Sequence, residues 1–221
     1  SIIGGVEIKL TEAFFNDPLA VGRNYVIPVV MNKVTGADYI LTGKAQSTVA
    51  SPNRNIADHW TVLPKDYVLY AVRYINTWDG TYMRRGKDDI TTTAGTTSSV
   101  RRKTSVELDE LCKLNTLSLT KLEFPVKYYD NNNVVVNQAL LELTFDSNGN
   151  CTISSRTAGV TATGTGSFKK KGELKSWGNK DRDALYLDYS IDFGAKQFAT
   201  KDTLVARDRG IIMETFEVVV Q

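Results

Sequence analysis

The polar and aromatic residues best suited to bind a ligand stand together in one short segment. Residues 176–182 read Ser-Trp-Gly-Asn-Lys-Asp-Arg, so an indole ring lies beside amide, carboxylate and guanidinium groups. Proteins hold sugars with such groups, because C–H faces of a sugar pack on aromatic rings and its hydroxyls bond to planar polar side chains. With two further aromatic residues as platforms, the sequence predicts a carbohydrate-contacting rim. Its residues are Trp177, Asn179, Asp181, Arg182, Trp78 and Tyr82.

A structural role competes with this interpretation of Trp177. A tryptophan in a loop often folds back over a core or closes the end of a barrel, and that arrangement needs no ligand. The two interpretations differ in where the tryptophans lie. A binding surface would bring Trp60, Trp78 and Trp177 to one solvent-facing side, whereas a covering role would bury them.

Catalytic and metal sites lack the residues that they need. His59 is the one histidine, and no Gly-x-Ser-x-Gly motif accompanies it, so general-base catalysis by a histidine is not expected. One histidine and two distant cysteines, Cys112 and Cys151, do not supply the ligands of a zinc site. We expect both cysteines to be reduced and buried, and we expect no metal and no cofactor.

Paired carboxylates would suffice for a glycosidase, and the sequence contains several such pairs. Asp181 and Asp183 are two residues apart, a spacing that places both side chains on one face of a strand. Among 25 acidic residues, however, such pairs arise by chance and usually face solvent. The sequence therefore predicts a binding protein and not an enzyme.

Composition excludes two other classes of function. Lys and Arg number 27 against 25 acidic residues, a net charge of +2, which is too balanced for a surface that follows nucleic-acid phosphates. The apolar runs are all shorter than the roughly 20 residues of a membrane-spanning helix. We expect neither nucleic-acid binding nor a spanning helix.

Strand patterns dominate the chain. β-Branched and aromatic residues alternate with polar ones in short runs, and Asn, Asp and Gly mark tight turns between them. The clearest predicted strands are residues 67–75, 134–145, 184–193 and 197–207. Residues 86–104 lack apolar periodicity and are predicted to be a long loop, and residues 104–114 are predicted to be the one short helix.

These patterns predict an all-β protein of two parts. The first, residues 1–62, is expected to be a partial sandwich. The second, residues 66–221, is expected to be a closed or nearly closed antiparallel barrel with at most one short helix. The polar segment 52–64, with Pro52 and Pro64 at its ends, is predicted to join the two.

Several strings together resemble a family of cell-adhesion and glycan-utilisation lipoproteins of gut Bacteroidetes. The strings are Asn24-Tyr25-Val26-Ile27-Pro28, residues 36–44 (GADYILTGK), Tyr74-Ile75-Asn76, Gly80-Thr81-Tyr82, Arg84-Arg85-Gly86, residues 183–189 (DALYLDY) and residues 201–209 (KDTLVARDR). The resemblance spans nearly the whole chain. It implies an immunoglobulin-like domain of unknown function, of which residues 1–62 would be the latter half, followed by a lipocalin-like barrel.

The resemblance also implies a place in the cell and a role. Such proteins are surface-exposed lipoproteins of the outer membrane, or periplasmic, and the lipid that would anchor this one lies outside the chain. The role expected is non-catalytic binding or adhesion, with a carbohydrate of a polysaccharide-utilisation system as partner. Two alternatives remain open: a lipocalin-like carrier of a small apolar ligand, and a structural spacer.

Overall fold

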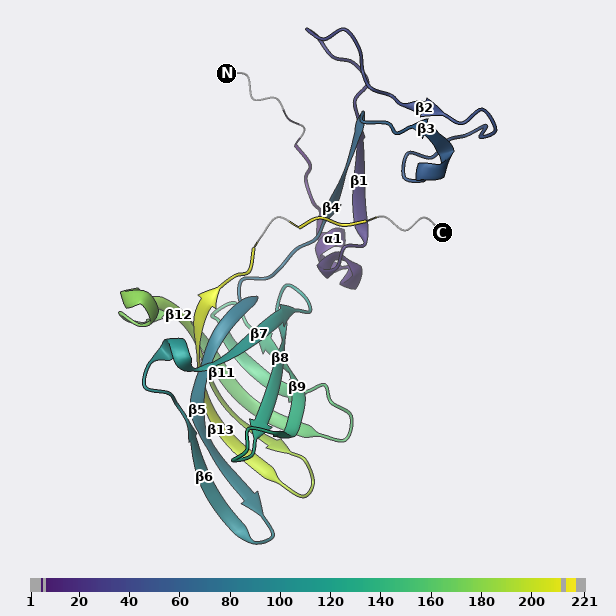
Figure 1. Cartoon of the computed structure of the whole chain (residues 1–221). Coiled ribbons are helices and arrows are strands. Elements are labelled where there is room, and N and C mark those ends of the chain that lie inside the picture. The colour runs from purple at the N-terminus through teal and green to yellow at the C-terminus, as the bar shows by residue number, and fades with distance from the viewer. Residues whose placement is uncertain (1–4, 6, 212–213, 218–221) are drawn as a thin grey trace. The chain divides into compact units, whose positions relative to one another are not determined.

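A computed structural model describes residues 5, 7–211 and 214–217 (Figure 1). These residues form two compact units, one drawn from 1–21 and 75–211 and the other from 22–74 and 212–221. The chain is all-β, and α1 (Glu12–Asn16) is the one α-helix among the described residues.

Antiparallel strands of the larger unit close into a barrel. The strands of its nine-stranded sheet are β5 (Gly80–Thr92), β6 (Gly95–Arg101), β7 (Glu110–Thr116), β8 (Lys121–Tyr129), β9 (Val135–Phe145), β10 (Asn150–Ser155), β11 (Thr161–Glu173), β12 (Arg182–Asp192) and β13 (Gln197–Asp208). The last strand, β13, pairs back with β5, so eight strands form a closed ring and β6 continues outside it as a hairpin partner of β5. Closure removes the unpaired edges that an open sheet would expose.

The smaller unit consists of two short strand pairs. β1 (Tyr25–Val30) pairs with β4 (Tyr67–Val72), and β2 (Lys44–Ala45) pairs with β3 (Trp60–Val62). Four 3₁₀ turns complete the described elements of the chain: η1 (Pro18–Val21), η2 (Ala57–His59), η3 (Val106–Leu108) and η4 (Trp177–Asn179). An immunoglobulin-like sandwich over residues 1–62 stays a prediction, and residues 1–4 and 6 of that range lie outside the described part of the chain.

The predicted barrel and its hairpins are confirmed, but two local predictions are wrong. Residues 86–104 are not a long loop, because β5 continues to Thr92 and turns into β6. Both faces of β6 are exposed to solvent. Its Thr and Ser residues therefore do not alternate with apolar ones. Residues 104–114 are not a helix either: η3 is a single turn, and Cys112 and Leu114 point inward from β7 with the period of a strand.

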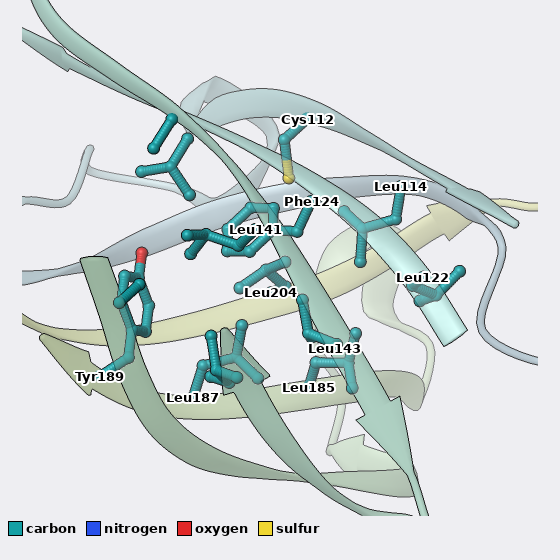
Figure 2. Close-up of a cluster of buried hydrophobic side chains, with 14 of the residues drawn as sticks. Cys112, Leu114, Leu122, Phe124, Leu141, Leu143, Leu185, Leu187, Tyr189 and Leu204 are labelled. Atoms are coloured by element: carbon teal, nitrogen blue, oxygen red, sulfur yellow. The ribbon is translucent and has the colours of Figure 1, made fainter. Parts of the chain in front are cut away.

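Inward-facing side chains fill the barrel. β8 buries every second residue, from Leu122 to Tyr128. The neighbouring strand β9 buries Leu141, Leu143 and Phe145 in the same core. Figure 2 shows these side chains meeting leucines of β12 and β13 at the centre.

Both cysteines lie in this core as free thiols, as the sequence predicts. Burial raises the pKa of the Cys112 and Cys151 thiols to about 12, so neither is a reactive thiolate at neutral pH.

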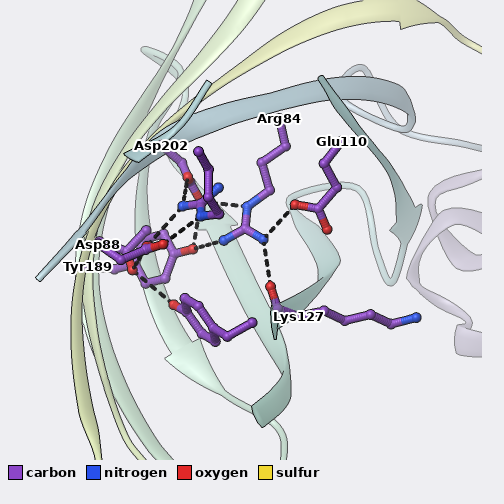
Figure 3. Close-up of polar contacts among 9 residues, drawn as sticks. Arg84, Asp88, Glu110, Lys127, Tyr189 and Asp202 are labelled. Carbon is purple, nitrogen blue, oxygen red and sulfur yellow. Dashed lines mark hydrogen bonds and ion pairs between the residues drawn. The ribbon is translucent and has the colours of Figure 1, made fainter. Parts of the chain in front are cut away.

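One arginine inside the barrel is fully buried and fully paired (Figure 3). Arg84 donates through Nε to Asp202 Oδ2 at 2.9 Å and through Nη2 to the hydroxyl of Tyr189 at 3.2 Å. Its Nη1 donates to Glu110 Oε2 and to the backbone carbonyl of Lys127, each at 3.2 Å. The Tyr189 hydroxyl in turn donates to Asp202 at 2.7 Å, so one carboxylate joins strands β5, β12 and β13.

A second arginine enters the same cluster from the hairpin strand β6. Arg101 donates to both oxygens of Asp88, at 2.6 and 2.9 Å, and to Asp202 Oδ1 at 2.6 Å. Two guanidinium groups thus share two buried carboxylates. We refer to Arg84, Asp88, Arg101, Tyr189 and Asp202 as the interior ionic cluster.

The interior ionic cluster lies where the barrel wall lacks backbone pairing. β8 pairs with β9 along its length but with β7 only through Asn115–Glu123 and Thr116–Leu122. Further along β8, Pro125 has no N–H to leave unpaired, and the carbonyl of Lys127 accepts from Arg84. A side chain therefore substitutes there for a missing strand-to-strand hydrogen bond.

Loss of one carboxylate from the cluster should destabilise the fold strongly. We expect Asp202→Asn to lower the free energy of unfolding by about 3–5 kcal/mol, because it leaves buried guanidinium charge without its counter-charge. The matched control is Asp188→Asn on the outer wall, where the ion pair to Lys201 is exposed (62% and 76%) and is expected to contribute little to stability. Equal losses in urea unfolding curves of the two variants would contradict the assigned role.

The same carboxylate should make stability depend on acid. Burial by itself would raise the pKa of Asp202, but the charges of Arg84 and Arg101 outweigh it and hold that pKa below the usual value of 3.8. The stabilisation is therefore complete above about pH 4 and is lost as pH falls through the lowered pKa. We expect unfolding free energies measured from pH 6 to pH 2 to fall less steeply in Asp202→Asn than in the unsubstituted protein.

Candidate functional site

A hollow of about 220 Å³ opens at the end of the barrel where β5 and β12 begin and β13 ends. Its floor contains the aromatic rings of Tyr82 and Phe168, and its rim is charged. The rim residues are Asp79, Asp181, Arg182, Asp183, Arg207, Asp208 and Arg209. We call this feature the barrel-end hollow.

A tight turn presents the part of the rim that the sequence predicts. Gly178 and Asn179 have φ values of 65° and 54°, a conformation that glycine and asparagine tolerate best. The turn is closed by a hydrogen bond of 2.9 Å from the N–H of Ser176 to the carbonyl of Lys180. It places Trp177 and Arg182 next to each other at the start of β12.

Trp177 and Arg182 stabilise each other. The Arg182 guanidinium carbon lies 4.2 Å from the centre of the indole ring, and its Nε donates to the carbonyl of Trp177 at 3.1 Å. Nη1 of the same arginine reaches the carbonyl of Arg207 at 3.4 Å, so the turn is tied to the end of β13. The indole ring therefore supports the arginine from behind, and the half-buried Arg182 lines the hollow.

Two carboxylates of the rim are held in position but keep bonding capacity. Asp181 accepts from the backbone N–H of Lys175 at 3.0 Å, and Asp183 accepts from that of Lys171 at 2.8 Å, each through Oδ1. Within the part of the chain that the structure describes, neither Oδ2 atom accepts a hydrogen bond. Each carboxylate can thus accept a hydroxyl from a ligand in the hollow.

The floor is fixed by the core beneath it. Tyr82 is buried, and its hydroxyl donates to the carbonyl of Trp78 at 2.7 Å. Burial raises the pKa of Tyr82 well above its ordinary value, so the phenol stays neutral. Trp78 does not line the hollow, because its ring stacks on Phe145 at 3.9 Å between centroids and packs against the core.

The structure therefore brings half of the predicted site residues into one hollow. Tyr82, Asp181 and Arg182 line it, Trp177 backs the arginine, Asn179 is exposed on the turn, and Trp78 belongs to the core. Trp60, which the sequence analysis compares with Trp78 and Trp177, lies in the other unit.

Sequence reasoning missed other residues of the rim and floor. Asp79 accepts from Lys113 and from the N–H and hydroxyl of Thr116, which ties the start of β5 to β7. Arg209 donates to the backbone carbonyls of Asn76 and Thr77 at 2.6 Å each. Phe168 comes from β11 and reaches the hollow only through the fold, whereas Asp183 on β12 is the partner of Asp181 in the carboxylate pair that the sequence contains.

The chemistry of the hollow is that of hydrogen bonding to a small polar ligand. Its volume lies below the roughly 300–1,000 Å³ of drug-sized sites, so it suits a single ring or a chain end. Among the described residues, no three His, Cys, Asp or Glu side chains are grouped closely enough to hold a metal ion. In the same part of the chain, no helix has the length and apolar character needed to cross a membrane.

Residues 77–210, which contain the whole barrel, match the family described as Domain of unknown function (DUF5627). The chain belongs to the DUF5627 family. Every residue of the barrel-end hollow lies within the matched range.

Solved structures include a protein of unknown function from Bacteroides ovatus that shares this fold. It is 40% identical in sequence with a TM-score of 0.82, and the alignment covers 92% of this DUF5627 chain but 64% of the other. An auxiliary nutrient binding protein from Bacteroides thetaiotaomicron VPI-5482 aligns at 11% identity and a TM-score of 0.32, covering 81% and 56% of the two chains, a similarity too low to inform fold or function. No curated protein matches the sequence.

Removal of the arginine should loosen the turn without unfolding the barrel. We expect Arg182→Ala to lower the free energy of unfolding by no more than about 1–2 kcal/mol, because the stacked cation is only half-buried. Amide exchange of residues 175–181, followed by mass spectrometry, should accelerate. Arg207→Ala is the control, since that side chain pairs loosely with Asp208 at 3.5 Å; equal acceleration in both variants would refute the support that Arg182 gives to Trp177.

Proposed function

We propose that this DUF5627 protein is a non-catalytic surface protein that binds carbohydrate at the barrel-end hollow. The observation that carries the proposal is the joining of three predicted sugar-contacting residues, Tyr82, Asp181 and Arg182, in one hollow. A sugar ring placed there would rest its C–H groups on the half-buried ring of Phe168, beside which Tyr82 is almost fully buried. Its hydroxyls would bond to Asp181, Asp183 and Arg182.

The packed interior favours this function over that of an apolar carrier. A carrier needs an apolar cavity large enough for its ligand. Here Phe124, Leu141, Leu143 and Leu185 are fully buried in one core cluster of the barrel (Figure 2), and the buried side chains of Arg84, Asp88 and Asp202 also lie inside it. A polar ligand at the barrel end requires no rearrangement of these side chains.

The cellular setting is part of the proposal. We infer that the protein works at the outer-membrane surface of a Bacteroides-type cell, in adhesion or in the capture of a polysaccharide, held there by a lipid outside this chain. The 40% identical protein from Bacteroides ovatus supports the type of cell. The alignment covers 64% of that protein's chain, and the lipid anchor belongs to the proposal alone.

Retardation of the protein in native gels that contain a polysaccharide tests the proposal. Native electrophoresis through gels containing soluble xylan, mannan, pullulan, laminarin or pectic galactan should retard the protein on at least one of them. We expect Arg182→Ala and Trp177→Ala to reduce that retardation about fivefold or more, since each removes a contact or its support.

A control variant separates the site from general surface effects. Tyr129→Ala removes an exposed aromatic residue (40%) at the last position of β8, and retention should be unchanged. Absence of retardation on all five glycans would refute carbohydrate binding. Retardation that survives both rim substitutions would place the binding elsewhere than the barrel-end hollow.

A further inference from the structure

A second, larger depression lies on the outer wall of the barrel. It has a volume of about 450 Å³ and lies over β11, β12 and β13, away from the rim residues of the barrel-end hollow. Its outward-facing side chains are Thr165, Ser167, Tyr186, Asp188, Lys201 and Thr203. We call it the outer-wall depression.

Two glycines explain why the wall is hollowed at this place. Gly164 and Gly166 occupy inward-facing positions of β11, where most residues of the barrel carry a side chain. A Cβ at Gly164 would lie 2.4 Å from Cβ of Tyr189, and one at Gly166 would lie 2.4 Å from Cδ2 of Leu187. The backbone of β11 therefore packs directly on interior side chains at these positions, and Gly166 lines the depression outside.

The side chains around the depression are arranged for a neutral, polar ligand. The half-buried ring of Tyr186 is fixed because its hydroxyl donates to Glu173 Oε1 at 2.7 Å, which leaves a flat apolar surface in the depression. Asp188 and Lys201 pair at 2.7 Å, so their charges cancel.

Three side-chain hydroxyl groups lie beside the ring of Tyr186. Within the described residues, the side chains of Thr165, Ser167 and Thr203 form no hydrogen bond. Each hydroxyl can donate and accept a hydrogen bond. Ser167 on β11 and Thr203 on β13 lie on either side of Tyr186 in one row across the sheet, and Thr165 lies two residues from Ser167 on β11. Because neighbouring strands lie about 4.8 Å apart, Ser167 and Thr203 are about 10 Å apart, so an extended chain of polar groups that crosses the ring can contact both.

We propose that the outer-wall depression is a second carbohydrate subsite, which holds an internal stretch of a neutral glycan whose end enters the barrel-end hollow. This inference rests on the proposed function of that hollow. Arg182 and Tyr186 are four residues apart on β12, a separation of about 13 Å along the strand that a short oligosaccharide spans. Two weak contacts on one ligand reinforce each other, because binding at the first raises the local concentration at the second.

Oligosaccharides of two lengths distinguish one subsite from two. The probes are xylo-, manno-, malto-, laminari- and galacto-oligosaccharides of two and of six residues, titrated by calorimetry. The unsubstituted protein should bind a hexasaccharide at least about tenfold more tightly than the matching disaccharide. Tyr186→Ala should weaken the hexasaccharide about five- to tenfold and leave the disaccharide unchanged.

Further variants keep the test independent of folding and of the first site. The double variant Thr165→Val and Thr203→Val preserves shape and removes two hydroxyls, so it should weaken the hexasaccharide likewise, whereas Thr152→Val, an exposed threonine on β10 outside the depression, should not. Hexasaccharide binding that falls in Arg182→Ala but not in the depression variants would overturn the second subsite and leave the proposed function standing. Binding of no probe at either length would overturn both.

Discussion

The contact between Arg84 and Asp202 is the interaction on which the barrel depends. A buried charge is costly unless it is paired and hydrogen-bonded, and each guanidinium nitrogen of this arginine donates to at least one acceptor from β7, β8, β12 or β13. The cluster thereby connects strands that backbone pairing connects poorly, because β7 and β8 share only two residue pairs. The charges of the two guanidinium groups favour the ionised form of Asp202 by lowering its pKa. Polar groups fill one part of the barrel interior and packed leucines another, and the two proposed ligand sites lie at the end of the barrel and on its outer wall.

Most of the fold was predictable from the sequence because the barrel strands bury alternate residues. β9, β12 and β13 show this period clearly, and the turns between strands contain the expected Asp, Asn and Gly. A strand that has no buried face does not show this alternation of apolar and polar residues. β6 has solvent on both faces, so only its pairing with β5 identifies it as a strand. The apparent helix before Leu114 arose because apolar residues of a single turn, η3, and of the strand after it happened to fall at helical spacing.

The candidate site was predictable only as far as it is local. The turn around Gly178 and the neighbouring Arg182 follow from residues adjacent in the chain, and the sequence identified both. Trp78 has polar neighbours, which made it resemble a surface residue, yet its ring stacks on Phe145 from a distant strand. Phe168 and Arg209 join the hollow from segments that are distant in sequence from Arg182, so no local pattern places them there. The outer-wall depression depends on glycines whose effect is visible only once Leu187 and Tyr189 are seen to pack on them.

Closure of the ring by β5 and β13 has a consequence for how the protein acquires its structure. Its first strand finds one of its partners only in the last, with Tyr82 opposite Ala206, so the longest-range contact of the barrel is also the one that completes it. Contacts between residues so distant in sequence slow folding, and barrels rich in them fold in about milliseconds to seconds. A chain still being synthesised therefore cannot close the ring before β13 has emerged from the ribosome. Arg84 is synthesised before Asp202. Until Asp202 is in place, the guanidinium of Arg84 must keep its hydrogen bonds to water.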